Sequence, residues 1–193
     1  SEISDNVEFG VRGTVGRGSY TANIYYNRIS DYIYLQLTGD EVDEQQIAQY
    51  TTNDARFIGY EVTWDQTVHE GESFAIDVGL SADAVRASFS GGGNVPRIPG
   101  NTTGSELRFY GDQWTVELNA SHVRHQRHTG ELELPTQGYN RVSLYTDYHW
   151  NLANDVDVVV FARGENLLDE EIRSHSSFLK HYAPESGRSV RVG

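Results

Sequence analysis

The chain lacks cysteine, has only four prolines, and contains no long apolar run. Without cysteine there is no disulfide framework, no thiolate metal site and no cysteine nucleophile. No stretch approaches the roughly 18 consecutive apolar residues that a transmembrane helix requires, which excludes a helical membrane protein. Basic residues are also scarce: 15 Lys and Arg against 28 Asp and Glu give a net charge of −13. A nucleic-acid partner, which needs a basic surface, is therefore not expected.

Apolar and polar residues alternate along about nine runs of the sequence. In the first run the apolar residues are Val7, Phe9, Val11 and Val15, and the polar ones between them are Glu8, Arg12 and Thr14. A period of two predicts a β-strand with one apolar face. The second run, about 20–37, changes phase near Asp31, which predicts a β-bulge there.

Short and long connections alternate between these runs. The short ones are 17–19, 69–73, 111–113 and 151–155, and the long ones are about 38–55, 89–102, 127–139 and 169–186. Aromatic residues gather near the strand ends, namely Tyr20, Trp64, Trp114, Tyr148 and Trp150. Together these features favour an antiparallel transmembrane β-barrel. A soluble sandwich stays open, because alternation alone does not show whether lipid or a second sheet covers the apolar face.

Three C-terminal segments resemble the end of the barrel in TonB-dependent outer-membrane receptors. They are Gly164-Glu-Asn-Leu-Leu-Asp-Glu-Glu171, Arg173-Ser-His-Ser-Ser-Phe-Leu-Lys180 and Ala183-Pro-Glu-Ser-Gly-Arg-Ser-Val190. The series is most similar to the zinc-uptake-type branch of that family. The residues that carry the resemblance are Asn166, Leu167, Leu168, Asp169, Phe178, Leu179, Lys180, Pro184, Gly187 and Arg188.

Weaker similarities to the family fall in order upstream, at 54–61, 94–99 and 133–139. The resemblance implies that residues 1–193 are part of one barrel domain, about the last nine strands of roughly 22. The long loops would then be extracellular and the short turns periplasmic, and the plug domain and N-terminal strands would be missing from this chain. One departure is the end at Val192-Gly193, where the family usually has an aromatic residue.

The function implied by the resemblance is uptake of a scarce metal or metal complex across the outer membrane. The cargo would be zinc or an iron complex of the siderophore or haem type, and no further cofactor is required. The expected partners are outer-membrane lipid and lipopolysaccharide, the remaining barrel strands, and the inner-membrane TonB complex acting through the plug. Two alternatives are a secreted, soluble all-β ligand-binding module and a passive porin-like barrel.

Histidines supply the candidate metal ligands, because neutral imidazole binds zinc and other transition metals. Those in or beside the long loops are His122, His125, His128, His175 and His181. On a strand, positions 122 and 128 would point to one side and 125 to the other, so the three would converge only if the chain bends into a loop. The alternative is that they are solvated histidines at the rim.

Acidic residues on the polar faces of the strands are expected to line the lumen. They are Glu61, Asp65, Asp77, Asp83 and Glu117. Their negative potential would concentrate hydrated cations at the channel mouth. An enzyme is not expected, because Gly91-Gly92-Gly93 lacks the lysine and Ser/Thr of a phosphate-binding loop and no Gly-x-Ser-x-Gly elbow occurs.

Overall fold

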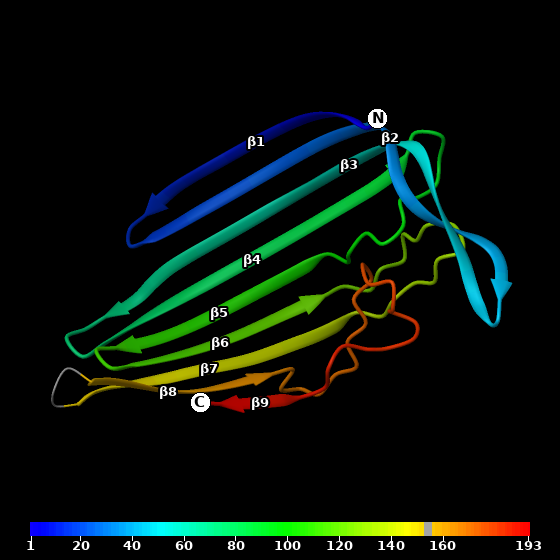
Figure 1. The fold of residues 1–193 in the computed structure, drawn as a ribbon. Helices are drawn as coiled ribbons and strands as arrows, with labels where there is room; N and C mark the ends of the chain where they lie inside the picture. The colour runs from blue at the N-terminus through cyan, green and yellow to red at the C-terminus, as the bar shows by residue number, and fades with distance from the viewer. Residues whose placement is uncertain (153–155) are drawn as a thin grey trace.

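The computed structural model describes residues 1–152 and 156–193, which form a single antiparallel sheet with its strands in chain order (Figure 1). The strands are β1 (Ile3–Val15), β2 (Gly18–Val42), β3 (Gln45–Glu70), β4 (Phe74–Phe89), β5 (Thr102–Gly111), β6 (Trp114–Val123), β7 (Tyr139–Leu152), β8 (Val156–Glu165) and β9 (Ser189–Val192). The described residues include no helix that could cross a membrane. The expected all-β class and the nine strands are confirmed.

The sheet is open, with β1 at one edge and β9 at the other. Each strand pairs with its neighbours in sequence, so every connection within the sheet is a hairpin or a longer loop between adjacent strands. An open sheet leaves a row of backbone N–H and C=O groups unpaired at each edge. The architecture is therefore a partial barrel wall with two edges available to further strands.

The pairing register places apolar residues on one face. In one row across three strands, Phe9 lies opposite Ile24, and Ile24 lies opposite Tyr60. These side chains are exposed, with Phe9 at 65% of its maximal accessibility. A soluble sandwich would need a second sheet over this face, but all nine described strands belong to one sheet.

A bulge interrupts β2, as the change of phase predicts. The register with β3 shifts between Ile29 and Tyr32, and Asp31 takes a positive φ of 56°. Beyond the bulge β2 continues to Val42, so the prediction of a long loop over 38–55 is wrong. Residues 45–53, which include three Gln and two Thr, pair with β2. The acidic turn Asp43-Glu44 has φ angles of 50° and 63°, as a two-residue type I′ hairpin requires.

Short turns lie at one end of the sheet and long connections at the other (Figure 1). The described short turns are 16–17, 71–73 and 112–113; of the predicted short connection 151–155, residues 153–155 lie outside the described residues. We call the long-connection end the loop rim: residues 90–101, 124–138, 166–188 and the β2–β3 hairpin beyond Asp31. An apolar cluster of Ala55, Ala87, Phe89 and Val95 packs the connection 90–101 of the loop rim against β3 and β4.

Candidate functional site

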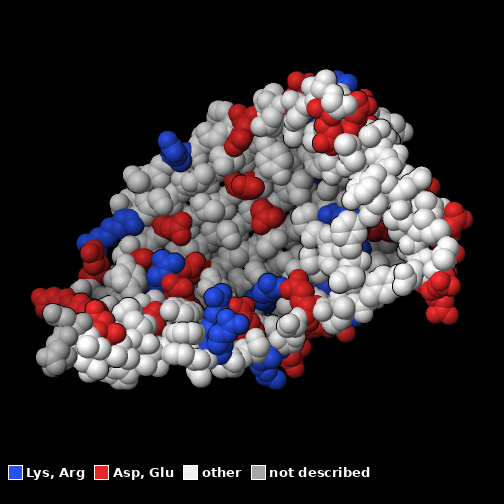
Figure 2. Space-filling view, viewed as in Figure 1, with Lys and Arg blue, Asp and Glu red and all other residues white. Residues whose placement is uncertain are grey.

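The carboxylates predicted to face the lumen all lie on the polar face of the sheet. They are Glu61, Asp65, Asp77, Asp83 and Glu117. Figure 2 shows acidic groups within the hollowed face of the molecule. The alternation of the strands correctly predicts their common side.

Arginine neutralises part of this acidic surface. The Arg108 Nε atom donates to Glu117 Oε1 at 3.0 Å, and Asp77 lies directly opposite Arg108 in the register. Glu61 and Asp83 differ: they lie directly opposite each other on β3 and β4, and neither forms a salt bridge in the described part of the chain. Like charges in this position destabilise a strand pair. A cation between them would relieve that repulsion.

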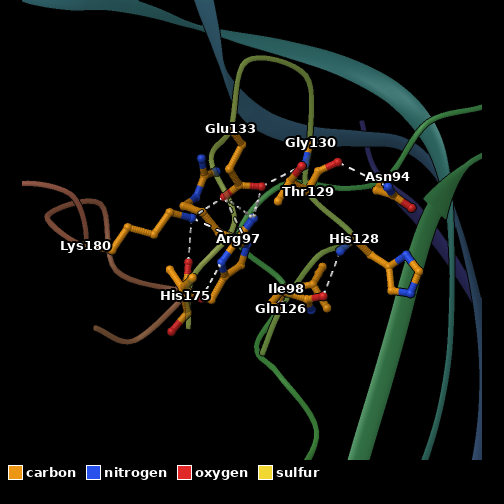
Figure 3. Close-up of polar contacts among 12 residues, drawn as sticks. Asn94, Arg97, Ile98, Gln126, His128, Thr129, Gly130, Glu133, His175 and Lys180 are labelled. Atoms are coloured by element: carbon orange, nitrogen blue, oxygen red, sulfur yellow. Dashed lines mark hydrogen bonds and ion pairs between the residues drawn. The ribbon is translucent and has the colours of Figure 1, made fainter. Parts of the chain in front are cut away.

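At the loop rim, Glu133 joins two long connections (Figure 3). Its carboxylate pairs with the Lys180 ammonium and lies 3.4 Å from His175 Nε2. All three side chains are buried, at 7%, 5% and 2% exposure for Glu133, Lys180 and His175. The His175 Nδ1 atom lies 3.0 Å from Thr136 Oγ1. Buried charges in proteins are normally paired in this way, because an isolated one loses its hydration.

The hydrogen bonds at Glu133 set the protonation state of the cluster. Burial alone would raise the pKa of Glu133, but bonds from His175, Lys180 and the Gly130 N–H outweigh it and lower the pKa from 4.5 to about 2. Burial lowers the pKa of Lys180, although its bond to Glu133 and the Glu133 charge act in the opposite direction. Glu133 is therefore ionised at neutral pH, with Lys180 held against it.

Arg97 connects this cluster to the remaining parts of the loop rim. Its backbone N–H donates to Glu133 Oε1 at 3.0 Å, and its Nη1 donates to the Leu35 carbonyl of the β2–β3 hairpin at 3.2 Å. The guanidinium also lies 4.3 Å from the centre of the Phe178 ring, a cation–π contact. Four segments that are distant in sequence thus meet at one arginine.

A cavity of about 850 Å³ lies beside these contacts. Its wall includes Tyr34, Phe89, Arg97, Phe178 and His181. Burial lowers the pKa of His181, and the charge of Lys180 lowers it further, so its imidazole is neutral at pH 7. Aromatic surface with a few polar groups is typical of small-molecule sites of this volume.

Several residues that carry the family resemblance close the base of the last loop. The buried Asn166 side chain donates to the carbonyls of Glu170 at 2.9 Å and Ser186 at 3.3 Å, and accepts from the Glu170 N–H. Asp169 accepts from the Arg188 N–H at 2.8 Å. A Cβ atom at Gly187 would lie 3.0 Å from an Asp169 carboxylate oxygen, which is a tight contact.

The remaining residues that carry the family resemblance differ in their surroundings. The Leu167 N–H donates to the Val142 carbonyl at 2.9 Å, which anchors the loop to β7. Leu168, Phe178 and Leu179 are exposed, and Pro184 precedes Glu185, whose N–H donates to the backbone carbonyl of the buried Ile172 at 2.8 Å. The motif thus reflects both loop closure and exposed rim surface.

The structure separates the candidate histidines. His122 is on the apolar side of β6, where its Nδ1 atom lies 2.9 Å from Asn140 Oδ1. His125 and His128 follow the end of β6, and the Nε2 atom of His125 is buried with no hydrogen-bond partner among the described residues. His175 and His181 belong to the last loop, near Lys180. Across residues 1–152 and 156–193, no three His, Asp or Glu side chains form a group that could hold a metal ion.

Sequence reasoning did not single out Glu133 and Arg97 as site residues. Both fall in segments that resemble the family, but nothing local marks either as a partner of Lys180 or Phe178. Glu133 and Lys180 are 47 residues apart, and Arg97 and Glu133 are 36 apart. The only local signal was the family-like spacing around them.

A hollowed antiparallel sheet with an exposed apolar face, an acidic polar face and interlocked connections at one rim has the features of a transmembrane β-barrel wall. The family model "TonB dependent receptor-like, beta-barrel" matches residues 1–167. The chain therefore belongs to the TonB-dependent receptor β-barrel family.

Two solved structures share the fold. One is described as the copper transporter OprC, with a TM-score of 0.78, 20% identity, and coverage of 98% of this chain and 30% of that one. The other is the FrpB iron transporter from Neisseria meningitidis (F3-3 variant), with a TM-score of 0.69, 17% identity, and coverage of 99% and 30%. The chain thus spans about 30% of the length of these neighbours.

Proposed function

We propose that this chain is part of an outer-membrane receptor that imports a scarce metal or metal complex. The observation that carries the proposal is the division of one sheet into an apolar outer face and an acidic inner face, beneath a rim of interlocked loops. The apolar face suits lipid, and the acidic face suits a cation that passes along it. Family membership supports the same class, as does the fold shared with a copper transporter and an iron transporter.

In this proposal the loop rim is extracellular and the short turns are periplasmic. The edges β1 and β9 pair with the remaining strands of a closed barrel, because open edges are not tolerated in hydrocarbon. A plug domain encoded elsewhere in the full-length protein contacts the inner-membrane TonB complex. The outward face contacts outer-membrane lipid and lipopolysaccharide. The receptor acts by transport and not by catalysis.

For the cargo we favour a free cation, with zinc as the first choice and an iron complex as the second. Glu61 and Asp83 support a cation, because these two carboxylates lie opposite each other on β3 and β4 and form no salt bridge with any described residue. The cavity beside Phe178 and His181 supports a larger complex, because it combines aromatic surface with a neutral imidazole. The two sites could act in sequence, with capture at the rim and passage along the acidic face.

The test is uptake of radioactive zinc by cells that produce the full-length receptor. Glu61→Gln together with Asp83→Asn should slow zinc uptake at least tenfold. The matched control is Glu72→Gln with Asp112→Asn, which removes the same charge from the turn end. Equal uptake by both double variants would contradict the role of the acidic pair.

Energy coupling separates an active receptor from the porin-like alternative. An uncoupler of the proton-motive force should abolish zinc uptake by the receptor, because the TonB complex draws on that force. A passive barrel would continue to equilibrate zinc. Calorimetry with His125, His128, His175 and His181 changed to alanine tests the histidines separately, and unchanged zinc affinity would exclude them as ligands.

A further inference from the structure

Three arginines form a patch on the outward face of the sheet, next to the loop rim. They are Arg28 on β2, Arg56 on β3 and Arg86 on β4, and all three are exposed. Arg28 lies directly opposite Arg56, and Arg86 lies opposite Ile58, one row nearer the turns. We call these residues the arginine patch. In a chain of net charge −13, such a grouping is unexpected.

The arginine patch has no anionic partner within the described residues. Asp5 lies opposite Arg28, but no carboxylate comes within salt-bridge distance of any of the three guanidinium groups in residues 1–152 and 156–193. The nearby Asp54 carboxylate accepts instead from the Asp31 N–H at 3.1 Å. Arg56 Nε donates to Ser88 Oγ at 3.1 Å, which leaves most of its donors free.

Because Arg28 and Arg56 lie directly opposite each other, the absence of an anionic partner destabilises the folded sheet. Like charges directly opposite on neighbouring strands destabilise the sheet. An anion held between Arg28 and Arg56 would remove that repulsion, and a phosphate offers the oxygen geometry that guanidinium groups bind with two parallel hydrogen bonds.

The position of the patch indicates where that phosphate comes from. Toward the turns from Arg56, the outward residues of β3 are Ile58, Tyr60, Val62 and Trp64. From Ile58 to Trp64 this apolar row extends about 20 Å along the strand at roughly 3.3 Å per residue, which is about 15 Å of membrane height at the usual tilt of roughly 35–45° and so more than half of a barrel's lipid-facing band of about 25 Å. The patch therefore lies where the hydrocarbon ends and headgroups begin. At the turn end, by contrast, Arg17 is already paired with Glu70 at 3.0 Å.

We infer that the arginine patch binds the phosphate of a phosphorylated lipid in the outer leaflet, of the lipid A type. This inference rests on the proposed outer-membrane location and adds a specific lipid site to it. Arg28 and Arg56 clamp one phosphate between β2 and β3. Arg86 contacts the same headgroup from β4, while the acyl chains lie along the apolar row below.

The test uses the full-length receptor in detergent, titrated with diphosphoryl lipid A and with lipid A from which the phosphates have been removed. Arg28→Gln with Arg56→Gln should weaken binding of diphosphoryl lipid A at least tenfold, and Arg28→Lys with Arg56→Lys should retain more of it. The matched control is Arg12→Gln with Arg191→Gln, which removes two arginines from the polar face.

Three outcomes would overturn the inference: equal loss in the control, equal binding of dephosphorylated lipid A, or full displacement of lipid A by millimolar inorganic phosphate. Failure here is distinct from failure of the proposed function. A receptor that imports metal but binds lipid A independently of the patch contradicts only this site. A protein that remains monomeric in buffer without detergent contradicts the outer-membrane proposal itself.

Discussion

Replacing Glu133 with glutamine should release the contact between two long loops. Glutamine has nearly the same shape but no charge, so Lys180 remains buried opposite a neutral amide. A pKa lowered from 4.5 to about 2 corresponds to about 3 kcal/mol of stabilisation of the carboxylate, at roughly 1.4 kcal/mol per pKa unit. Breaking a buried ion pair by removing one partner typically costs about 3–5 kcal/mol, which agrees.

Hydrogen exchange measures this loss where it occurs. The N–H groups of Gly130 and Arg97 donate to Glu133, so their exchange reports opening of the cluster. A loss of about 3 kcal/mol should accelerate exchange in residues 124–138 by about a hundredfold, while β3 and β4 remain protected. Unchanged exchange in 124–138 would refute the reasoning.

Two variants make the assignment specific. Glu131→Gln is the matched control, because Glu131 is exposed in the same loop and receives a hydrogen bond from Gln36, at 3.2 Å, that glutamine can also accept. It should change exchange less than threefold. Glu133→Gln combined with Lys180→Met removes both opposite charges and should recover part of the protection, because no uncompensated ammonium is left.

Three further predictions concern the same rim. Asn166→Ala removes three hydrogen bonds and places alanine at a positive φ of 47°, so exchange in the last loop should accelerate by about tenfold or more while the strands are unaffected. The pKa of Glu133 is lower in the folded protein, so the ionised carboxylate contributes its full stabilisation above about pH 4.5 and loses it as the pH falls toward about 2. Protection of the loop from hydrogen exchange, corrected for intrinsic exchange, should therefore decline over this pH range in the natural protein. It should stay constant in the Glu133→Gln variant. Arg97→Ala removes the hydrogen bond to the Leu35 carbonyl and the contact with Phe178. Proteolysis at the Asp43-Glu44 hairpin turn should therefore be several times faster than in the natural protein. Equal cleavage rates would show that Arg97 does not restrain the hairpin.

The sequence was most informative about the strands. A period of two specifies which residues share a face. The register confirms this for Glu61 and Asp83 on the polar face and for the apolar residues that alternate with them along β3 and β4. The break in phase at Asp31 correctly located the bulge. These features are local, so the order of residue types was sufficient to find them.

The loop rim was harder to predict because its contacts are distant in sequence. The prediction of a loop over 38–55 is wrong because the polar residues of the β2–β3 extension hide the strand pattern and its stability comes from pairing across the turn. Glu133 and Lys180 meet only after the two loops 124–138 and 166–188 have folded together. Separation of the histidines likewise follows from the path of the chain after β6, which alternation does not specify.

The central claim is that the apolar face meets lipid and the polar face lines an aqueous lumen. Because this chain has no cysteine, single cysteines can be introduced at neighbouring positions of β3 in a full-length receptor without other cysteines. Val62→Cys and Tyr60→Cys should give a fluorophore label that brominated lipids quench strongly, whereas labels at Thr63→Cys and Glu61→Cys should not be quenched. Equal quenching at all four positions, or quenching of the second pair alone, would contradict the account.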